Sequence, residues 1–143
     1  MKTDLAISTL FLPMLAMFLW TLAMFVRNAV LRIRAIRSRH VSMRFFEVFK
    51  GAEMPENLQK ASNNLNNLMQ LPQLFYVICL YISFSSLTDP VFTAIAWLYV
   101  ALRAAHGIVH VTYNKVPHRF AFFIGSNIAL AVLWIRTAVF VLS

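Results

Sequence analysis

Four long apolar blocks, separated by polar segments, dominate the chain. They occupy residues 5–26, 65–87, 91–112 and 120–142, and each is close to the roughly 20 residues that a helix needs to cross hydrocarbon. A backbone in lipid must satisfy its own hydrogen bonds, which an open sheet edge cannot do. The pattern therefore predicts an all-α integral membrane protein, a bundle of four transmembrane helices. Because the spans use most of the 143 residues, we expect one domain over residues 1–143.

Basic residues are distributed unevenly among the connections between these blocks. The basic loop predicted over residues 27–60 holds most of them, the third connection holds Lys115 and Arg119, and the second, which ends at Pro90, holds none. Short connections rich in Lys and Arg stay in the cytoplasm. We therefore expect the first and third connections to be cytoplasmic and both termini to face outward, in a bacterial cytoplasmic membrane. Pro90 suits the start of the third helix.

The amino-acid composition is typical of a chain embedded in a membrane. Hydrophobic residues make up 60% of it and charged residues only 13%, whereas soluble domains contain about a quarter charged residues. The net charge of +8 is clustered between apolar blocks, which favours anionic lipid headgroups, and not nucleic acid, as partners. Residues 27–39 are expected to continue the first helix among those headgroups. Cys79, the single cysteine, is expected to be a small packing residue.

Amide side chains recur at three- and four-residue steps near the start of the second span. They are Asn63, Asn66, Asn67, Gln70 and Gln73, and this spacing predicts one shared helix face. Amides in a membrane are stabilised by hydrogen bonds across helices. They indicate either contacts between helices or a polar ligand site, and the residues alone leave both interpretations open.

The third span carries a second polar stripe. Its members are Tyr99, Arg103, His106, His110 and Asn114. A charged group within a span usually faces the bundle interior or a hydrated cavity, so Arg103 and His106 are candidate functional residues, with a structural clamp as the alternative. Haem or metal ligation is not expected, because haem needs ligands on facing helices and no other span has a central histidine.

Arg119 lies where the fourth helix is predicted to begin. A helix N-terminus and a guanidinium both favour a bound anion, such as a carboxylate or a thiolate. Anchoring to phospholipid is the alternative role for Arg119. Arg136 lies near the opposite end of the same helix, and its long side chain is expected to extend outward to the membrane surface.

Three motifs carry a family resemblance. Two lie in the second and third spans, and one lies in the third connection. They are Asn67-Leu68-Met69-Gln70-Leu71-Pro72, Leu102-Arg103-Ala104-Ala105-His106 and Tyr113-Asn114-Lys115-Val116-Pro117-His118-Arg119. Together they resemble the MAPEG family, the membrane-associated proteins in eicosanoid and glutathione metabolism. The resemblance runs from about Met54 to the C-terminus and more loosely through the first helix.

The resemblance implies a homotrimer that binds glutathione and brings its thiolate to a lipophilic small molecule from the bilayer. It implies that Arg119 is the catalytic residue, because an arginine at this position stabilises the thiolate in several members. The residues expected to bind glutathione or shape its site are Asn63, Asn66, Asn67, Gln70, Arg103, His106, His110 and Tyr113. The implied activity is that of a glutathione-dependent or other thiol-dependent transferase or peroxidase. The alternative is a non-catalytic scaffold that binds lipid or a protein.

The chain departs from the family pattern in its second helix. The family motif is Asn-x-x-Glu, but Gln70 replaces the acid, and Asn63 and Asn66 stand where arginines are often found. A glutamate could hold the ammonium of glutathione, whereas an amide offers only a neutral oxygen. Each lost charge-assisted hydrogen bond costs roughly 1.5 to 3 kcal/mol, or about ten- to a hundred-fold in affinity. Catalytic activity therefore stays an open question at this point.

Overall fold

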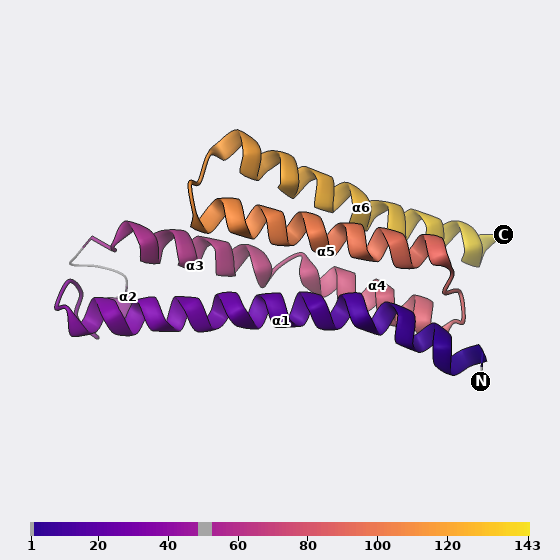
Figure 1. The fold of residues 1–143 in the computed structure, drawn as a ribbon, viewed down its shortest axis with the longest axis horizontal. Coiled ribbons are helices and arrows are strands. Elements are labelled where there is room, and N and C mark those ends of the chain that lie inside the picture. Colours follow the sequence, from indigo (N-terminus) through magenta and orange to yellow (C-terminus); the bar gives the residue numbers. More distant parts are fainter. Residues whose placement is uncertain (1, 49–52) are drawn as a thin grey trace.

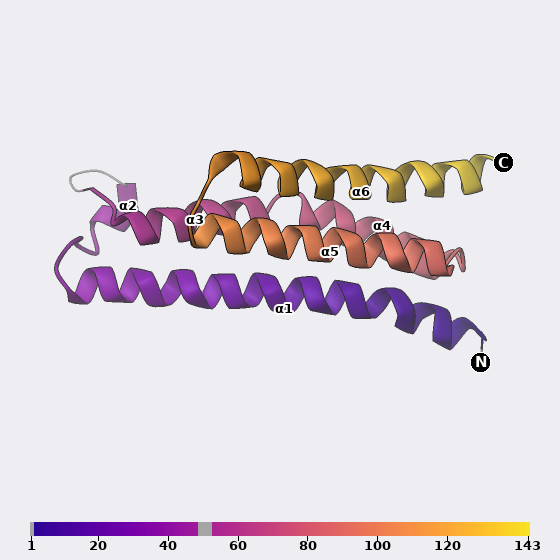
Figure 2. The ribbon, with the colours of Figure 1, turned by 45° about the horizontal axis from the view of Figure 1, so that its top comes forward.

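The computed structural model describes residues 2–48 and 53–143. They form an elongated bundle whose long helices run side by side (Figure 1). The elements are α1 (Lys2–Arg37), α2 (Phe45–Val48), α3 (Glu56–Leu68), α4 (Pro72–Phe84), α5 (Pro90–Val111) and α6 (Val116–Leu142). Both termini lie at one end, together with the α4–α5 turn (Figures 1 and 2). The opposite end, formed by residues 27–48 and 53–60, is called the basic end below.

Four helical segments are long and apolar enough to cross a membrane. They are Thr9–Arg37, Glu56–Phe84, Pro90–Val111 and Val116–Leu142, the second of which combines α3 and α4. The predicted all-α architecture with four spans is thereby confirmed, and the protein is an integral membrane protein. Which end faces the cytoplasm stays a prediction.

Several helix ends differ from the ends of the apolar blocks that predicted them. The expected continuation of the first helix through residues 27–39 is confirmed as far as Arg37, where α1 ends. The basic loop expected over residues 27–60 is also shorter than predicted at its other end, because residues 56–60 belong to α3; residues 49–52 lie outside the described residues. Apolar runs mark only the part of a helix inside hydrocarbon, whereas helical hydrogen bonding continues among the headgroups. Smaller differences follow at the other boundaries: α1 begins at Lys2, α4 ends at Phe84, α5 spans Pro90–Val111 and α6 begins at Val116.

The second span is broken between α3 and α4, where the apolar pattern predicted one continuous helix. Pro72 has no N–H to donate to the Leu68 carbonyl, and its ring crowds that carbonyl. The Met69 N–H closes α3 on the carbonyl oxygens of Leu65 at 3.0 Å and Asn66 at 3.2 Å. Pro72 then occupies the start of α4. The break places Gln70 in a turn.

An apolar core joins the long helices. Phe75 of α4 stacks on Tyr99 of α5 with ring centroids 4.4 Å apart, and Met17 of α1 and Leu133 of α6 belong to the same buried cluster. Cys79 is buried in this cluster with a free thiol, which confirms its predicted packing role. Many other large apolar side chains remain on the outside, as expected for helices that lipid solvates.

Asp89 and Arg136 fasten the α4–α5 turn to α6. One Asp89 oxygen caps α5 by accepting the Phe92 N–H at 2.8 Å, and the other pairs with the Arg136 guanidinium at 2.5 Å. That guanidinium also lies over the rings of Phe92 and Phe140, 4.8 and 5.2 Å from their centroids. Arg136 therefore does not simply extend outward as predicted, because a carboxylate lies within its reach.

The Asp89–Arg136 pair should make the stability of the bundle depend on pH. Burial raises the pKa of Asp89, but hydrogen bonds from the Phe92 N–H and Arg136, and the charge of Arg136, outweigh burial and lower that pKa below its ordinary value. The stabilisation is complete above the unfolded-state pKa of about 3.9 and is lost as the pH falls through the lower folded-state pKa. Thermal unfolding in detergent should show Tm falling in this acidic range, and Asp89→Asn should flatten the fall. If Tm of Asp89→Asn falls as much as that of the wild type, other titratable groups cause the pH dependence.

Gly107 marks a close approach of α5 to α1. A Cβ atom at this position would lie 2.9 Å from Cζ2 of Trp20, whereas one at Gly125 of α6 would meet Leu102 at 3.4 Å. Gly107→Ala should therefore be less stable than Gly125→Ala by about 1 to 3 kcal/mol, the usual cost of overpacking. The gain in helix propensity is similar in both variants and cancels. Denaturant unfolding in detergent measures the difference in the free energy of unfolding between the two variants. Equal values would show that the Trp20 ring can shift to make room for the new methyl group without loss of stability.

Candidate functional site

A cavity of about 200 Å³ lies between α3, α5 and α6, and three of the predicted site residues line it. These are Asn67 of α3, His106 of α5 and Arg119 of α6. Its remaining walls are apolar and come from Val116, Phe120 and Phe123. A few converging polar groups beside an apolar wall are typical of a site for a small molecule with a polar and an apolar part. This space is called the Arg119 cavity below.

His106 links α5 to the first turn of α6. Its Nδ1 lies 2.9 Å from the carbonyl oxygen of Arg119. A carbonyl oxygen can only accept, so Nδ1 carries the hydrogen and donates it. His106 is almost fully buried, and its Nε2 has no hydrogen-bond partner among the described residues.

Two neutral groups hold the guanidinium of Arg119 through one nitrogen. Nη1 donates to Oδ1 of Asn114 at 2.9 Å and lies 3.3 Å from Nε2 of His110. In the part of the chain that the structure describes, no carboxylate forms an ion pair with Arg119. The positive charge is therefore fixed in place without being neutralised, an arrangement that suits a bound anion.

Asn114 reaches Arg119 because of the way α5 ends. Its φ of 51° is left-handed, a conformation that asparagine adopts more readily than most residues. The Asn114 N–H donates to the Val109 carbonyl at 2.8 Å, which closes the end of α5. The predicted polar stripe of the third span thus ends in the turn, and Asn114 acts from there instead of from a helix face.

Arg103 is fully buried one turn before His106. Its Nε donates to the Tyr99 hydroxyl at 3.3 Å, and its guanidinium lies over the rings of Tyr99 and Phe123, 5.8 and 5.3 Å from their centroids. Nη1 and Nη2 find no hydrogen-bond partner among the described residues. The Phe123 ring also packs against the His106 ring, with centroids 5.7 Å apart. One ring therefore contacts both the buried cation and the Arg119 cavity.

The amides of α3 divide between two cavities, although their spacing predicted one shared face. Asn63 and Asn66 line a cavity of about 550 Å³ together with Arg32, Gln59 and Ser62, called the Arg32 cavity below. Asn67 lines the Arg119 cavity instead. One residue turns an α-helix by about 100°, so neighbouring residues such as Asn66 and Asn67 point to different sides.

The remaining predicted site residues lie outside both cavities. Gln70 is exposed in the α3–α4 break. Tyr113 is exposed, and its hydroxyl lies 3.2 Å from Nδ1 of His118. His110 is buried and reaches the Arg119 cavity only through its contact with Arg119. The structure therefore brings Asn67, His106, His110 and Arg119 together and keeps Asn63, Asn66, Gln70 and Tyr113 apart from them.

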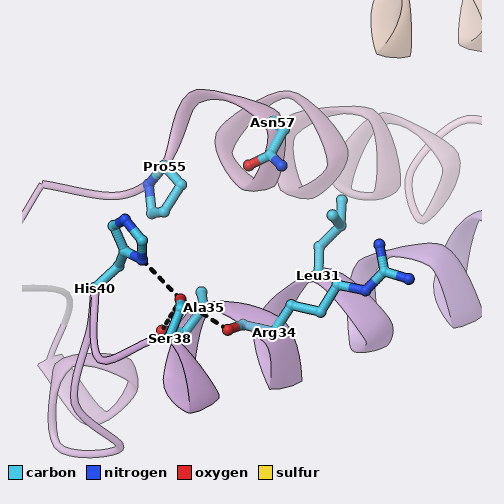
Figure 3. A pocket seen from close by; sticks show the side chains of 7 residues that line it. All are labelled: Leu31, Arg34, Ala35, Ser38, His40, Pro55 and Asn57. Atoms are coloured by element: carbon cyan, nitrogen blue, oxygen red, sulfur yellow. Dashed lines mark hydrogen bonds between the residues drawn. The ribbon is translucent and has the colours of Figure 1, made fainter.

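A third cavity, of about 330 Å³, lies at the basic end between α1 and α3 (Figure 3). Nδ1 of His40 lies 2.6 Å from the Ser38 hydroxyl, which itself donates to the Arg34 carbonyl. Figure 3 shows the Arg34 guanidinium extending past Leu31, away from His40. This cavity contains none of the predicted site residues and no converging cations, so it is not part of the candidate site.

The sequence patterns did not single out Phe123, which lines the Arg119 cavity, or Asn64, a buried amide of α3. Phe123 contacts both Arg103 and His106, and as one of 13 phenylalanines it carried no signal. Asn64 is fully buried, and neither its Nδ2 nor its Oδ1 has a described partner. Its place in the buried stripe Leu58, Ala61, Asn64 and Leu68 was a readable signal, because an amide at an apolar position is unusual.

Four helical segments that can cross a membrane, with a partly polar cavity between α3, α5 and α6, define an integral membrane protein. The model of the MAPEG family matches residues 10–139, a range that includes every residue of the Arg119 cavity. The chain belongs to the MAPEG family, and the resemblance inferred from its motifs is confirmed. No curated protein and no solved structure matches the chain.

Proposed function

We propose that the protein binds glutathione, or a related thiol that carries carboxylates, and acts as a thiol transferase or peroxidase on lipophilic electrophiles. The observation that carries this proposal is the Arg119 cavity, where a guanidinium without a described carboxylate partner adjoins an apolar wall. Membership of the MAPEG family, which includes glutathione-using members, supports the same chemistry.

Arg119 stabilises the thiolate in this proposal. The thiolate is the nucleophilic form and only a small fraction of a free thiol at neutral pH, and a nearby positive charge favours it. Asn114 and His110 fix the guanidinium, so the protein has already oriented the charge before the thiol arrives. Asn67 contributes an amide to the polar part of the ligand, and Arg103 supports the site through Phe123.

The described residues suit the anionic groups of glutathione better than its ammonium. Arg32 lines the Arg32 cavity beside Asn63 and Asn66, and its Nε is buried with no described hydrogen-bond partner, so a carboxylate fits there. Among the described residues, no carboxylate lines either of the two cavities. The proposed ligands therefore include thiols whose amino group is blocked.

We also propose the homotrimer that the family resemblance implies. Gln70 is exposed on the second span, and an amide that faces lipid loses hydrogen bonds that a neighbouring subunit can restore. In such an assembly Gln70 and Tyr113 can complete the site of another subunit. The basic end faces the cytoplasm in this proposal, with both termini outside.

Removing Arg119 should weaken thiol binding and leave the fold intact. Arg119→Ala loses a charge-assisted contact, so the dissociation constant of glutathione, measured by calorimetry in detergent, should rise about ten- to a hundred-fold. Thiol-dependent turnover should disappear with it. Arg37→Ala, at the exposed end of α1, is the matched control. Unchanged binding and turnover in Arg119→Ala would refute the proposed role.

A non-catalytic function on the same scaffold is the second candidate. The observation that favours it is Gln70, which replaces the acid of the family motif and lies outside both cavities. The Arg32 cavity would then hold the anionic headgroup of a lipid at the membrane surface. This function predicts no thiol turnover at all.

Gln70→Glu tests whether position 70 contacts the bound thiol in the assembled protein. If Gln70 faces the bound thiol in the assembled protein, the new carboxylate pairs with the ammonium and tightens glutathione binding about ten-fold or more. N-acetylated glutathione, which lacks the ammonium, should not gain. Gln73→Glu, exposed in the first turn of α4, is the matched control. If the wild type, Gln70→Glu and Gln73→Glu bind glutathione with equal affinity, Gln70 lies outside the thiol site.

A further inference from the structure

His106 and His110 hold Arg119 through opposite hydrogen-bonding roles. His106 donates from Nδ1 to the backbone carbonyl of Arg119 at 2.9 Å. His110 contacts the side chain, with its Nε2 3.3 Å from Nη1. A guanidinium has only donors. Nε2 of His110 must therefore accept, which requires that this nitrogen carries no hydrogen and that Nδ1 carries it.

Protonation affects the two contacts differently. A protonated His106 still donates from Nδ1, so its bond to the carbonyl persists. A protonated His110 has a hydrogen on both ring nitrogens and can no longer accept from Arg119. It also places a second positive charge against the guanidinium, which repels it. Only the contact made by His110 is lost.

No described acid stands near His110 to compensate such a charge. The groups that face it are Arg119 of α6, His106 one turn earlier on α5 with ring centroids 5.7 Å apart, and Lys60 of α3. Lys60 already pairs with Glu56 at 2.7 Å. An imidazolium at position 110 would thus meet cations and a histidine. Repulsion would displace the long side chain of Arg119, because its guanidinium lies directly against Nε2 of His110.

We propose that His110 is a positioning residue, which holds the Arg119 guanidinium at the Arg119 cavity only while its imidazole is neutral. Acid then releases Arg119, leaving Asn114 as its remaining described acceptor, and weakens the binding of an anion there. This inference rests on the proposed function, since it regulates the same site. The binding of an anion beside Arg119 should therefore weaken as the pH falls and His110 becomes protonated.

Calorimetry with glutathione sulfonate tests this, because its sulfonate places a fixed negative charge where the thiolate would lie and does not titrate at these pH values. For the wild-type protein in detergent, the affinity should be about ten-fold lower at an acidic pH that protonates His110 than at about pH 7.5, the effect of losing one charge-assisted contact. In His110→Gln an amide oxygen can accept from Arg119 at both pH values, so the two affinities should converge. His40→Gln, an exposed histidine at the basic end, should behave as wild type. A His110→Gln variant that keeps the wild-type ratio overturns the proposal.

Nitrogen-15 NMR of the ligand-free protein separates this inference from the proposed function. At neutral pH, His110 should carry its hydrogen on Nδ1, and the guanidinium signals of Arg119 should shift as His110 titrates, but not in His110→Gln. A hydrogen on Nε2, or no shift, overturns the positioning role whatever the ligand is. The expected NMR result without any binding of the probe would support the positioning role and overturn the proposed function.

Discussion

Polar groups of α5 lie inside a bundle whose outer surface faces lipid, so they must find their partners within the protein. Two of the contacts that meet this requirement join α5 to Arg119 at the first turn of α6: His106 bonds its carbonyl and His110 its guanidinium. These are also the helices that pack most extensively against each other. The shape of the Arg119 cavity depends on both contacts, because they set how the first turn of α6 closes over α3 and α5.

Arg103 shows what this interior demands. Moving a charge out of water costs several kcal/mol even after the protein relaxes, and cation–π contacts return about 2 kcal/mol when they are desolvated. Tyr99 and Phe123 supply these contacts, and no described carboxylate supplies more. An apolar side chain would pack there at lower cost. Because the cost of burying the charge exceeds what the cation–π contacts return, Arg103 is better explained by a role in the site than by a role in stability. Its contact with the site is the Phe123 ring, which also packs against His106.

The sequence predicted those parts of the fold that follow from one local rule. Hydrocarbon thickness fixes the length of an apolar block, so the four spans were visible, and Pro90 identified the start of α5. The continuation of α1 among its arginines was predicted, whereas the start of α3 before the second apolar block was missed, because helical hydrogen bonding does not stop where hydrophobicity does. Pro72 was a visible cause for the α3–α4 break, but a search for long apolar runs joins the two segments across it.

The candidate site was predicted only as far as spacing along one helix allows. The stripe from Tyr99 to His110 is buried as its periodicity indicated, and the motifs brought Arg119 into consideration. Pairings between elements could not be read in this way. The meeting of Arg136 with Asp89 requires the tertiary fold, and so does the role of His110 as an acceptor, because each depends on two segments that the chain folds together.

The size of the cavities bears on how a thiol tripeptide could be held. The Arg119 cavity, at about 200 Å³, is smaller than the roughly 300 to 1,000 Å³ of most ligand pockets, so within one chain it has room for the reactive end of such a ligand and little else. The carboxylates need a second region of positive charge. The Arg32 cavity offers one, but Asn66 and Asn67 line the two spaces from different sides of α3, and a short ligand cannot pass through a helix. For the proposed thiol ligand, this division therefore requires either a path around α3 within one chain or a second subunit that contributes one of the two regions.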